Sequence, residues 1–195
     1  MKKKIVALVL SALMVTGLVG CGSNNDSSTS GEGALKVGMI TNSGTIDDKS
    51  FNQGTWEGIE KAQKDFNLDE PKYLKPSGET KADYLKEIGN LYDAGYRLIA
   101  TPGFKFETAI HKAQDQYKDA KFVLIDGEPN DGNGNYSIAD NTVAIYFAEE
   151  QSGFIAGVAS AVQLQSGDFG FIGGMEIPSV KKFNCGFQQG VAYAN

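Results

Sequence analysis

Hydrophobic and polar residues follow two different periods along the chain. From residue 35 onward, short apolar runs of strand length, such as 36–41 (KVGMIT), are separated by longer segments in which apolar residues recur at helical spacing. The segment 51–66 is the clearest of these, because its apolar residues recur at helical spacing: Phe51, Trp56, Ile59, Ala62 and Phe66. The pattern therefore predicts strands and amphipathic helices in alternation.

The alternation continues through most of the chain. Strands are expected at 36–41, 71–74, 97–101 and 121–126, with one or two more within 136–147 and another at 168–173. Helices are expected at 51–66, 80–92, 104–117, 149–164 and 178–194, and 126–135 has the composition of a loop. A βαβα order with buried apolar strands is typical of an α/β fold with a parallel, doubly wound sheet.

Sheets of this kind bind ligands beyond the carboxyl ends of their strands, where loops converge and helices begin. Applied to the predicted strands, this rule selects four segments as the candidate site: 42–51, 101–104, Asp126 with Gly127, and 174–183. We therefore expect a binding cavity between segments that lie far apart in the sequence.

The N-terminus has the features of a secretory signal. Three lysines precede an apolar run, 5–19, which is shorter than the roughly 20 residues of a membrane-spanning helix and typical of a signal peptide. The run leads into Leu-Val-Gly-Cys, which resembles the bacterial lipobox and implies that residues 1–20 are removed and Cys21 is lipidated. Residues 21–34 are expected to form a flexible tether. The protein is then expected on the extracytoplasmic face of the cell membrane, held by its lipid anchor.

Composition narrows the function further. Removal of the three signal lysines changes the formal net charge from −6 to −9, and an acidic chain without a basic run is unsuited to binding nucleic acid. His111 stands without the clustered ligands of a metal site. No nucleophile–base grouping supports catalysis, and no motif calls for a cofactor. Cys185, the only cysteine beyond Cys21, lies in an apolar helical context and is expected to be a small core residue.

Four motifs, in order along the chain, resemble those of one known family. They are TNSGTIDDKSFNQGTWEGIE, KFVLIDGE, FAEEQSGFIAG and GGMEIPSVKKFNCGFQQGV, and they are similar to those of the basic membrane lipoproteins, purine nucleoside receptors that serve ABC-type importers. The resemblance implies a type I periplasmic-binding fold, in which two α/β lobes close on a nucleoside, and a transporter permease as partner. Because members of the family are longer than this chain, residues 35–166 would form the first lobe and 167–195 the beginning of the second.

The resemblance also implies ligand contacts by Asn42, Phe51, Asn52, Asp126 and Phe183. Phe51 and Phe183 would stack on the purine, and Asp126 would accept hydrogen bonds from the ribose diol. The family often has aspartate where Asn42 stands, and an amide donates as well as accepts, so a changed base preference is expected. From the residues alone, Phe51 could also fill a core position at a helix start, although Trp56 and Ile59 already supply the core face, and Asp126 suits a turn beside glycine.

Other residues of the motifs are expected to be structural. Asp47 and Asp48 precede the helix that begins near Phe51, and Asp48 is placed to cap it. Glu149 and Glu150 open another helix, where negative charge suits the helix dipole. Trp56 is expected in the core.

Two readings of the chain stay open. In the first, it is a non-enzymatic receptor that binds a purine nucleoside, or another solute such as a sugar, and hands it to a permease. In the second, it is a truncated, surface-exposed fragment whose incomplete second lobe binds no ligand tightly. Because the second lobe would be incomplete, residues 35 to about 164 are expected to fold as a compact unit, and 168–195 to be poorly ordered.

Overall fold

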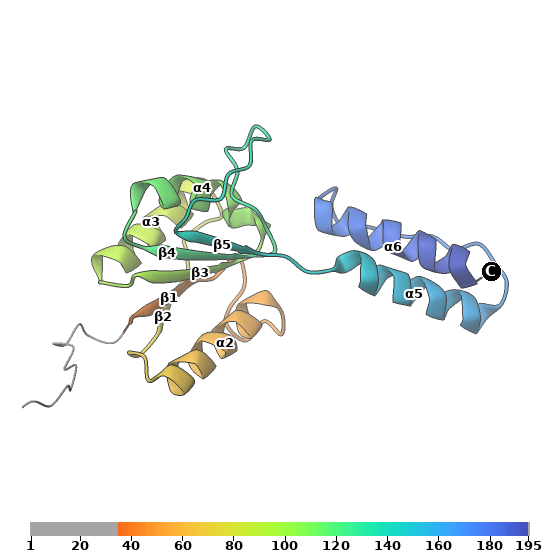
Figure 1. The fold of residues 1–195 in the computed structure, drawn as a ribbon, viewed down its shortest axis with the longest axis horizontal. Helices are drawn as coiled ribbons and strands as arrows, with labels where there is room; N and C mark the ends of the chain where they lie inside the picture. The colour runs from red at the N-terminus through yellow and green to blue at the C-terminus, as the bar shows by residue number, and fades with distance from the viewer. Residues whose placement is uncertain (1–34, 195) are drawn as a thin grey trace, which may run out of the picture. The chain divides into compact units, whose positions relative to one another are not determined.

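The structure, a computed structural model, describes residues 35–194, so the predicted signal peptide, Cys21 and the tether lie outside the described residues. Its sheet has five strands in the order β2-β1-β3-β4-β5 (Figure 1), and all neighbouring strands are parallel. The strands are β1 (Val37–Ile40), β2 (Lys72–Leu74), β3 (Leu98–Pro102), β4 (Lys121–Ile125) and β5 (Thr142–Ile145). The predicted parallel α/β fold is confirmed.

The helices of the described residues follow the predicted order. They are α2 (Phe51–Phe66), α3 (Lys81–Asp93), the 3₁₀ turn η1 (Phe104–Phe106), α4 (Glu107–Gln116), α5 (Glu149–Leu164) and α6 (Pro178–Ala194). Their bounds lie within a residue of the predicted ones, when η1 and α4 are taken together as the helix expected at 104–117. Between 136 and 147 there is one strand, β5, where one or two were expected.

Helices cover both faces of the sheet, because alternate residues of a strand point to opposite sides. On one face, α3 and α4 bury Ile88 and Ile110 against strand residues that include Ile99. On the other face, α2 packs through Ile59 against β1 and β3, and Trp56 lies partly buried beside it. The two buried clusters make the sheet doubly wound and hold the carboxyl ends of its strands in place.

Helix α2 begins with a side-chain cap that fixes the loop before it. The carboxylate of Asp48 accepts hydrogen bonds from the backbone N–H groups of Ser50, Asn52 and Gln53, at 2.8, 3.3 and 3.1 Å. These N–H groups lie at the start of the helix, where the backbone has no partner of its own. The predicted capping role of Asp48 is confirmed.

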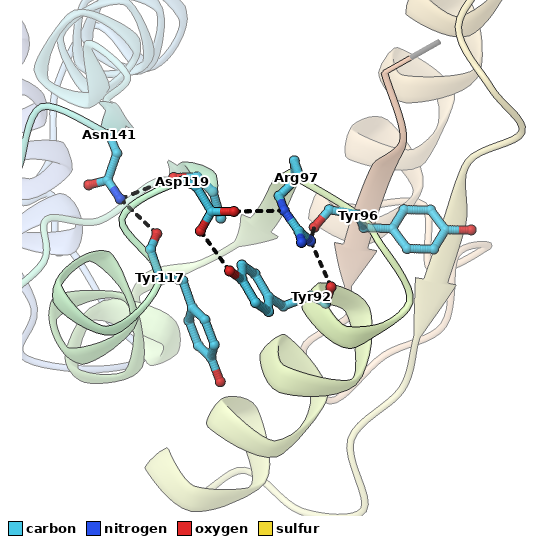
Figure 2. A network of polar contacts seen from close by, with 7 residues as sticks. Tyr92, Tyr96, Arg97, Tyr117, Asp119 and Asn141 are labelled. Atoms are coloured by element: carbon cyan, nitrogen blue, oxygen red, sulfur yellow. Dashed lines mark hydrogen bonds and ion pairs between the residues drawn. The ribbon is translucent and has the colours of Figure 1, made fainter. Parts of the chain in front are cut away.

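A polar network joins the segments that enter the strands at their amino ends (Figure 2). Arg97, just before β3, donates from Nε to Asp119 at 3.0 Å, and the Tyr92 hydroxyl donates to the same carboxylate at 2.7 Å. Asn141, just before β5, donates from Nδ2 to the carbonyl oxygens of Tyr117 and Ala120, at 3.2 and 3.0 Å. These contacts tie three strand entrances together at the end of the sheet opposite to the carboxyl ends of the strands.

Helices α5 and α6 lie side by side (Figure 1), and small residues form their contact. Gly153 and Gly157 of α5 face Gly186 and Gly190 of α6, and a Cβ atom on any of the four would overlap a backbone carbonyl oxygen of the other helix. The region expected to be poorly ordered, 168–195, thus contains a long helix in close backbone contact with α5.

Two predictions for this region are wrong. The strand expected at 168–173 is absent from the described structure, because a strand needs a neighbour for its N–H and C=O groups and this segment joins none; Ile172 within it is 98% exposed. Cys185 is exposed rather than a core residue. The buried side of α6 is formed by Gly186 and Gly190, and Cys185 points away from it. Among the described helices, none combines the length and the apolar character that crossing a membrane requires.

Candidate functional site

A cavity of about 720 Å³ lies at the carboxyl ends of the strands. Its wall is formed by residues that follow β1, β3, β4 and β5, together with residues from α2, α5 and α6. Each of the four segments selected from the sequence contributes side chains or backbone to it: Asn42 and Phe51; Pro102, Gly103 and Phe104; Asp126; Ile177, Ser179 and Phe183. The tertiary structure thus brings these distant segments to one place.

Aromatic rings form much of the apolar wall. Phe51, at the first position of α2, is 39% exposed, and Phe183, in α6, is 38% exposed. Both therefore keep part of their ring surface open, as a ring that stacks on a ligand must. A third ring, Phe147, lies after β5 with its centroid 6.1 Å from that of Phe51. The core alternative for Phe51 is not what the structure shows, since Ile59 supplies the buried face of the helix.

Asp126 follows β4 in the left-handed backbone region, with φ of 59°, which aspartate tolerates better than most side chains. Its backbone N–H donates to the carbonyl oxygen of Ile145 at 2.8 Å, which continues the pairing of β4 with β5, and the residue lines the cavity. Burial raises the pKa of its carboxyl, and the nearby charge of Glu149 raises it further. Lys182 acts in the opposite direction and lies 3.4 Å from the Glu149 carboxylate.

Asn42 follows β1, and a hydrogen bond from the buried Asn52 holds its side chain in place. Asn52 is fully buried; its amide donates to the side-chain oxygen of Asn42 at 2.8 Å and to Asp48 at 2.9 Å. Asn52 is therefore not among the residues that line the cavity. It supports Asn42, which is.

The four segments predicted from the sequence omit seven residues of the wall, including Glu149 and Phe147. Glu149, read as a structural residue of a helix start, is 5% exposed and lies beside Asp126 in the cavity. Phe147 was not singled out, although the strand-end rule applied to β5 would have found it. Asp126 and Glu149 form one corner of the cavity, and a smaller cavity of about 290 Å³ adjoins it. The smaller cavity is lined by the same two residues and by others that include Glu107, Glu128 and Lys182. This side of the site is therefore acidic.

The arrangement suits binding rather than bond-making. An apolar wall with a few oriented polar groups is typical of ligand pockets. Within residues 35–194, no group of three His, Cys, Asp or Glu side chains is placed to hold a metal ion. The carboxylates of Asp126 and Glu149 accept hydrogen bonds, so that side of the cavity is suited to hydroxyl groups of a ligand.

Comparisons with known proteins match the chain to one family. Residues 35–195 match the family described as ABC transporter substrate-binding protein, PnrA-like. The chain is 31% identical over 205 residues to the CD4+ T-cell-stimulating antigen of Listeria innocua, a match that covers 100% of this chain and 55% of that protein. It is also 31% identical over 194 residues to the ABC transporter nucleoside-binding protein BmpA of Lactococcus lactis, covering 97% of this chain and 53% of that protein.

A solved structure shares the fold. The ABC transporter solute-binding protein of Aeropyrum pernix K1 superposes with a TM-score of 0.63 and 25% sequence identity, and the match covers 83% of this chain and 44% of that one. The chain spans about half the length of the curated relatives it matches.

Proposed function

The chain belongs to the PnrA-like family of ABC transporter substrate-binding proteins, and on that premise we propose that it binds a purine nucleoside in the cavity at the carboxyl ends of β1, β3, β4 and β5. Members of this family bind a solute for transport rather than transform it, which confirms the expectation of a non-enzymatic protein. The resemblance found in the sequence is confirmed by the same match.

One observation carries the choice of ligand. Phe51 and Phe183 lie in the wall of a single cavity with part of each ring open, and Asp126 lies in the same wall. A nucleoside has a flat apolar base and a polar sugar, and stacking on an aromatic ring contributes roughly 1–3 kcal/mol per base. The acidic corner around Asp126 and Glu149 suits the ribose hydroxyls, which donate hydrogen bonds.

The cellular setting is part of the same proposal. Lipid on Cys21 anchors the mature chain at the extracytoplasmic face of the membrane, and the bound nucleoside passes from there to the permease of an ABC importer. Acyl chains contribute about 0.8 kcal/mol for each buried methylene, so two or more of them hold a protein firmly to a bilayer.

The division of the chain into lobes stays a prediction. The sequence suggested a boundary after residue 166, whereas the backbone of α5 contacts α6 closely, which favours a boundary before Glu149. In either case, Ile177, Ser179 and Phe183 of the wall belong to the second lobe, which the resemblance predicts to be longer than its part in this chain. We therefore expect the 195-residue chain to bind more weakly than a version of full family length, by about a thousandfold if roughly 4 kcal/mol of contacts is missing.

Thermal unfolding with added ligand tests the proposal. A ligand that binds only the native state stabilises it by RT ln(1 + [L]/Kd), so in a version of full family length inosine, guanosine or adenosine should raise the Tm more than ribose does. Phe51→Ala should weaken this binding about 10- to 100-fold. Phe66→Ala is the matched control, because Phe66 is 73% exposed at the other end of α2. A larger shift with a hexose than with any purine nucleoside would assign the cavity to sugars instead.

A further inference from the structure

The amide of Asn42 can present either of two chemistries to the cavity. Its nitrogen donates hydrogen bonds and its oxygen accepts them, and the two ends have nearly the same shape. The end that faces the ligand determines whether this point of the wall selects an acceptor or a donor. In the structure that choice is made by the hydrogen-bonding neighbours of Asn42, of which Asn52 and Gly44 lie outside the cavity and Pro102 lies in its wall.

The first of them is Asp48, whose ionised carboxylate only accepts hydrogen bonds. Asn52 therefore has to turn its nitrogen toward Asp48, at 2.9 Å. The oxygen of Asn52 then faces the backbone N–H of Asn42, which only donates, at 3.0 Å. The Asp48 carboxylate, which accepts, and the Asn42 backbone N–H, which donates, are therefore both satisfied by only one orientation of the Asn52 amide.

Asn52 passes this orientation on to Asn42. The Asn52 nitrogen donates its other hydrogen to the side-chain oxygen of Asn42 at 2.8 Å, and the backbone N–H of Gly44 donates to the same oxygen at 3.1 Å. The Asn42 nitrogen donates to the carbonyl oxygen of Pro102 at 3.3 Å, which can only accept. The Asn42 nitrogen also lies beside Gly103 in the cavity wall, 3.6 Å from the position that a Cβ atom on residue 103 would occupy.

We propose, building on the function proposed above, that the chain of contacts from Asp48 through Asn52 fixes Asn42 as a hydrogen-bond donor toward the cavity, so that the site selects a ligand with an acceptor at this point. One hydrogen of the Asn42 nitrogen goes to Pro102, and the second is left for the ligand. Asp48 and Asn52 are positioning residues in this scheme, and Asn42 is the residue that sets specificity. An aspartate at position 42 would only accept, and would select the opposite ligand.

The orientation is measurable without any ligand. In the 15N-labelled 195-residue chain, the side-chain amide protons of Asn42 should show nuclear Overhauser effects to the α-protons of Gly103. The double variant Asp48→Asn/Asn52→Asp exchanges the acid and the amide. Residue 52 can then only accept a hydrogen bond from Asn42, so the Asn42 amide should turn over and lose those effects. Asp47→Asn is the matched control, because Asp47 contacts Thr45 and takes no part in the relay; it should leave them intact. Their absence from the unaltered chain overturns the proposal, even if the double variant fails to fold.

The ligand arm uses the same labelled samples and adenosine and inosine as probes. Chemical-shift titration measures weak affinities, and these two nucleosides have opposite hydrogen-bond polarity at ring positions 1 and 6. Asn42→Asp should change the ratio of their Kd values about tenfold or more, the effect of one hydrogen bond. If Asn42 faces a ring nitrogen that accepts a hydrogen bond in both nucleosides, the Asn42→Asp substitution should instead weaken the binding of both. Unchanged affinities for both nucleosides would overturn the proposal.

The two arms separate this inference from the proposed function. If the Overhauser effects are present but no purine nucleoside binds, the orientation of Asn42 holds and the nucleoside assignment fails. If nucleosides bind but the effects are missing, the cavity is a nucleoside site and the relay is wrong.

Discussion

Gly153 of α5 lies directly against the backbone of Phe183 in α6, so closely that a Cβ atom on residue 153 would overlap the carbonyl oxygen of Phe183. The absence of a side chain at one position thus determines where an aromatic ring of the cavity stands. Phe183 reaches the cavity because its helix approaches α5 at backbone distance.

Gly153→Ala should therefore push α6 away and displace Phe183. Overpacking of this kind typically costs about 1–3 kcal/mol of stability, and nucleoside affinity should fall with it. Gly58→Ala is the matched control: Gly58 lies within α2, a Cβ there meets no atom within 4 Å, and alanine in a helix is favoured over glycine by about 1 kcal/mol. Thermal unfolding and ligand titration of both variants measure these changes in stability and affinity. Equal affinity in Gly153→Ala and the unaltered chain would show that Phe183 does not depend on this contact.

Asp126→Asn should weaken nucleoside binding about 10- to 100-fold, because it removes a charged hydrogen-bond acceptor, yet make the free protein more stable at pH 7. The pKa of Asp126 is raised above 3.8 by burial and by Glu149. The native state therefore binds this proton more tightly than the unfolded state, and stability is lost as pH rises from 3.8 through the raised pKa. Replacing the carboxyl removes that loss.

The measurement is the free energy of unfolding as a function of pH for the unaltered chain and for Asp126→Asn. Asp131→Asn supplies a control of opposite sign. Hydrogen bonds from Asn135 and Asn133 lower the pKa of Asp131 to about 2, so its contribution is present above 3.8 and is lost as pH falls toward 2. An Asp126→Asn variant that is less stable than the unaltered chain at pH 7 would contradict the prediction.

Asn141→Ala should destabilise the fold without changing the site. Asn141 is 7% exposed, and its amide nitrogen donates to the carbonyl oxygens of Gln114, Tyr117 and Ala120. Alanine leaves these buried carbonyls without that donor, at a cost of about 2–3 kcal/mol. Chemical denaturation should show this loss, and Asn133→Ala, in an exposed loop, should stay within about 0.5 kcal/mol of the unaltered chain. Nucleoside affinity, corrected for the unfolded fraction, should be the same in both variants.

Cys21→Ser should release the protein from membranes, because it removes the thiol to which the lipid is attached. Fractionation of cells that express the variant should find it in the soluble fraction, and labelled palmitate should no longer enter it. Cys185→Ser, in the exposed position of α6, is the control and should remain bound and labelled. A Cys21→Ser protein that is still membrane-bound and labelled would refute the lipobox interpretation.

The order and bounds of the elements were predictable from the sequence because the periods of strands and helices are local. A residue in a strand alternates with its neighbours and a residue in a helix repeats each turn, so the helical spacing of Trp56 and Ile59 marks the side of α2 that packs on the sheet. Phe66 belongs to the same spacing but is 73% exposed, because it lies at the end of the helix. The four segments of the cavity wall followed from those bounds, since parallel strands direct their carboxyl ends to one edge of the sheet.

What the tertiary structure alone decided depends on partners far away in the chain. The strand expected at 168–173 is missing because no neighbouring strand pairs with it in the described residues, and Cys185 is exposed because α6 packs on α5 through Gly186 and Gly190. Glu149 became part of the acidic corner only when the structure placed it beside Asp126. The amide of Asn42 has the same composition in any fold, and its polarity toward the cavity is set by Asn52 and Pro102, whose fixed donors and acceptors no local pattern contains.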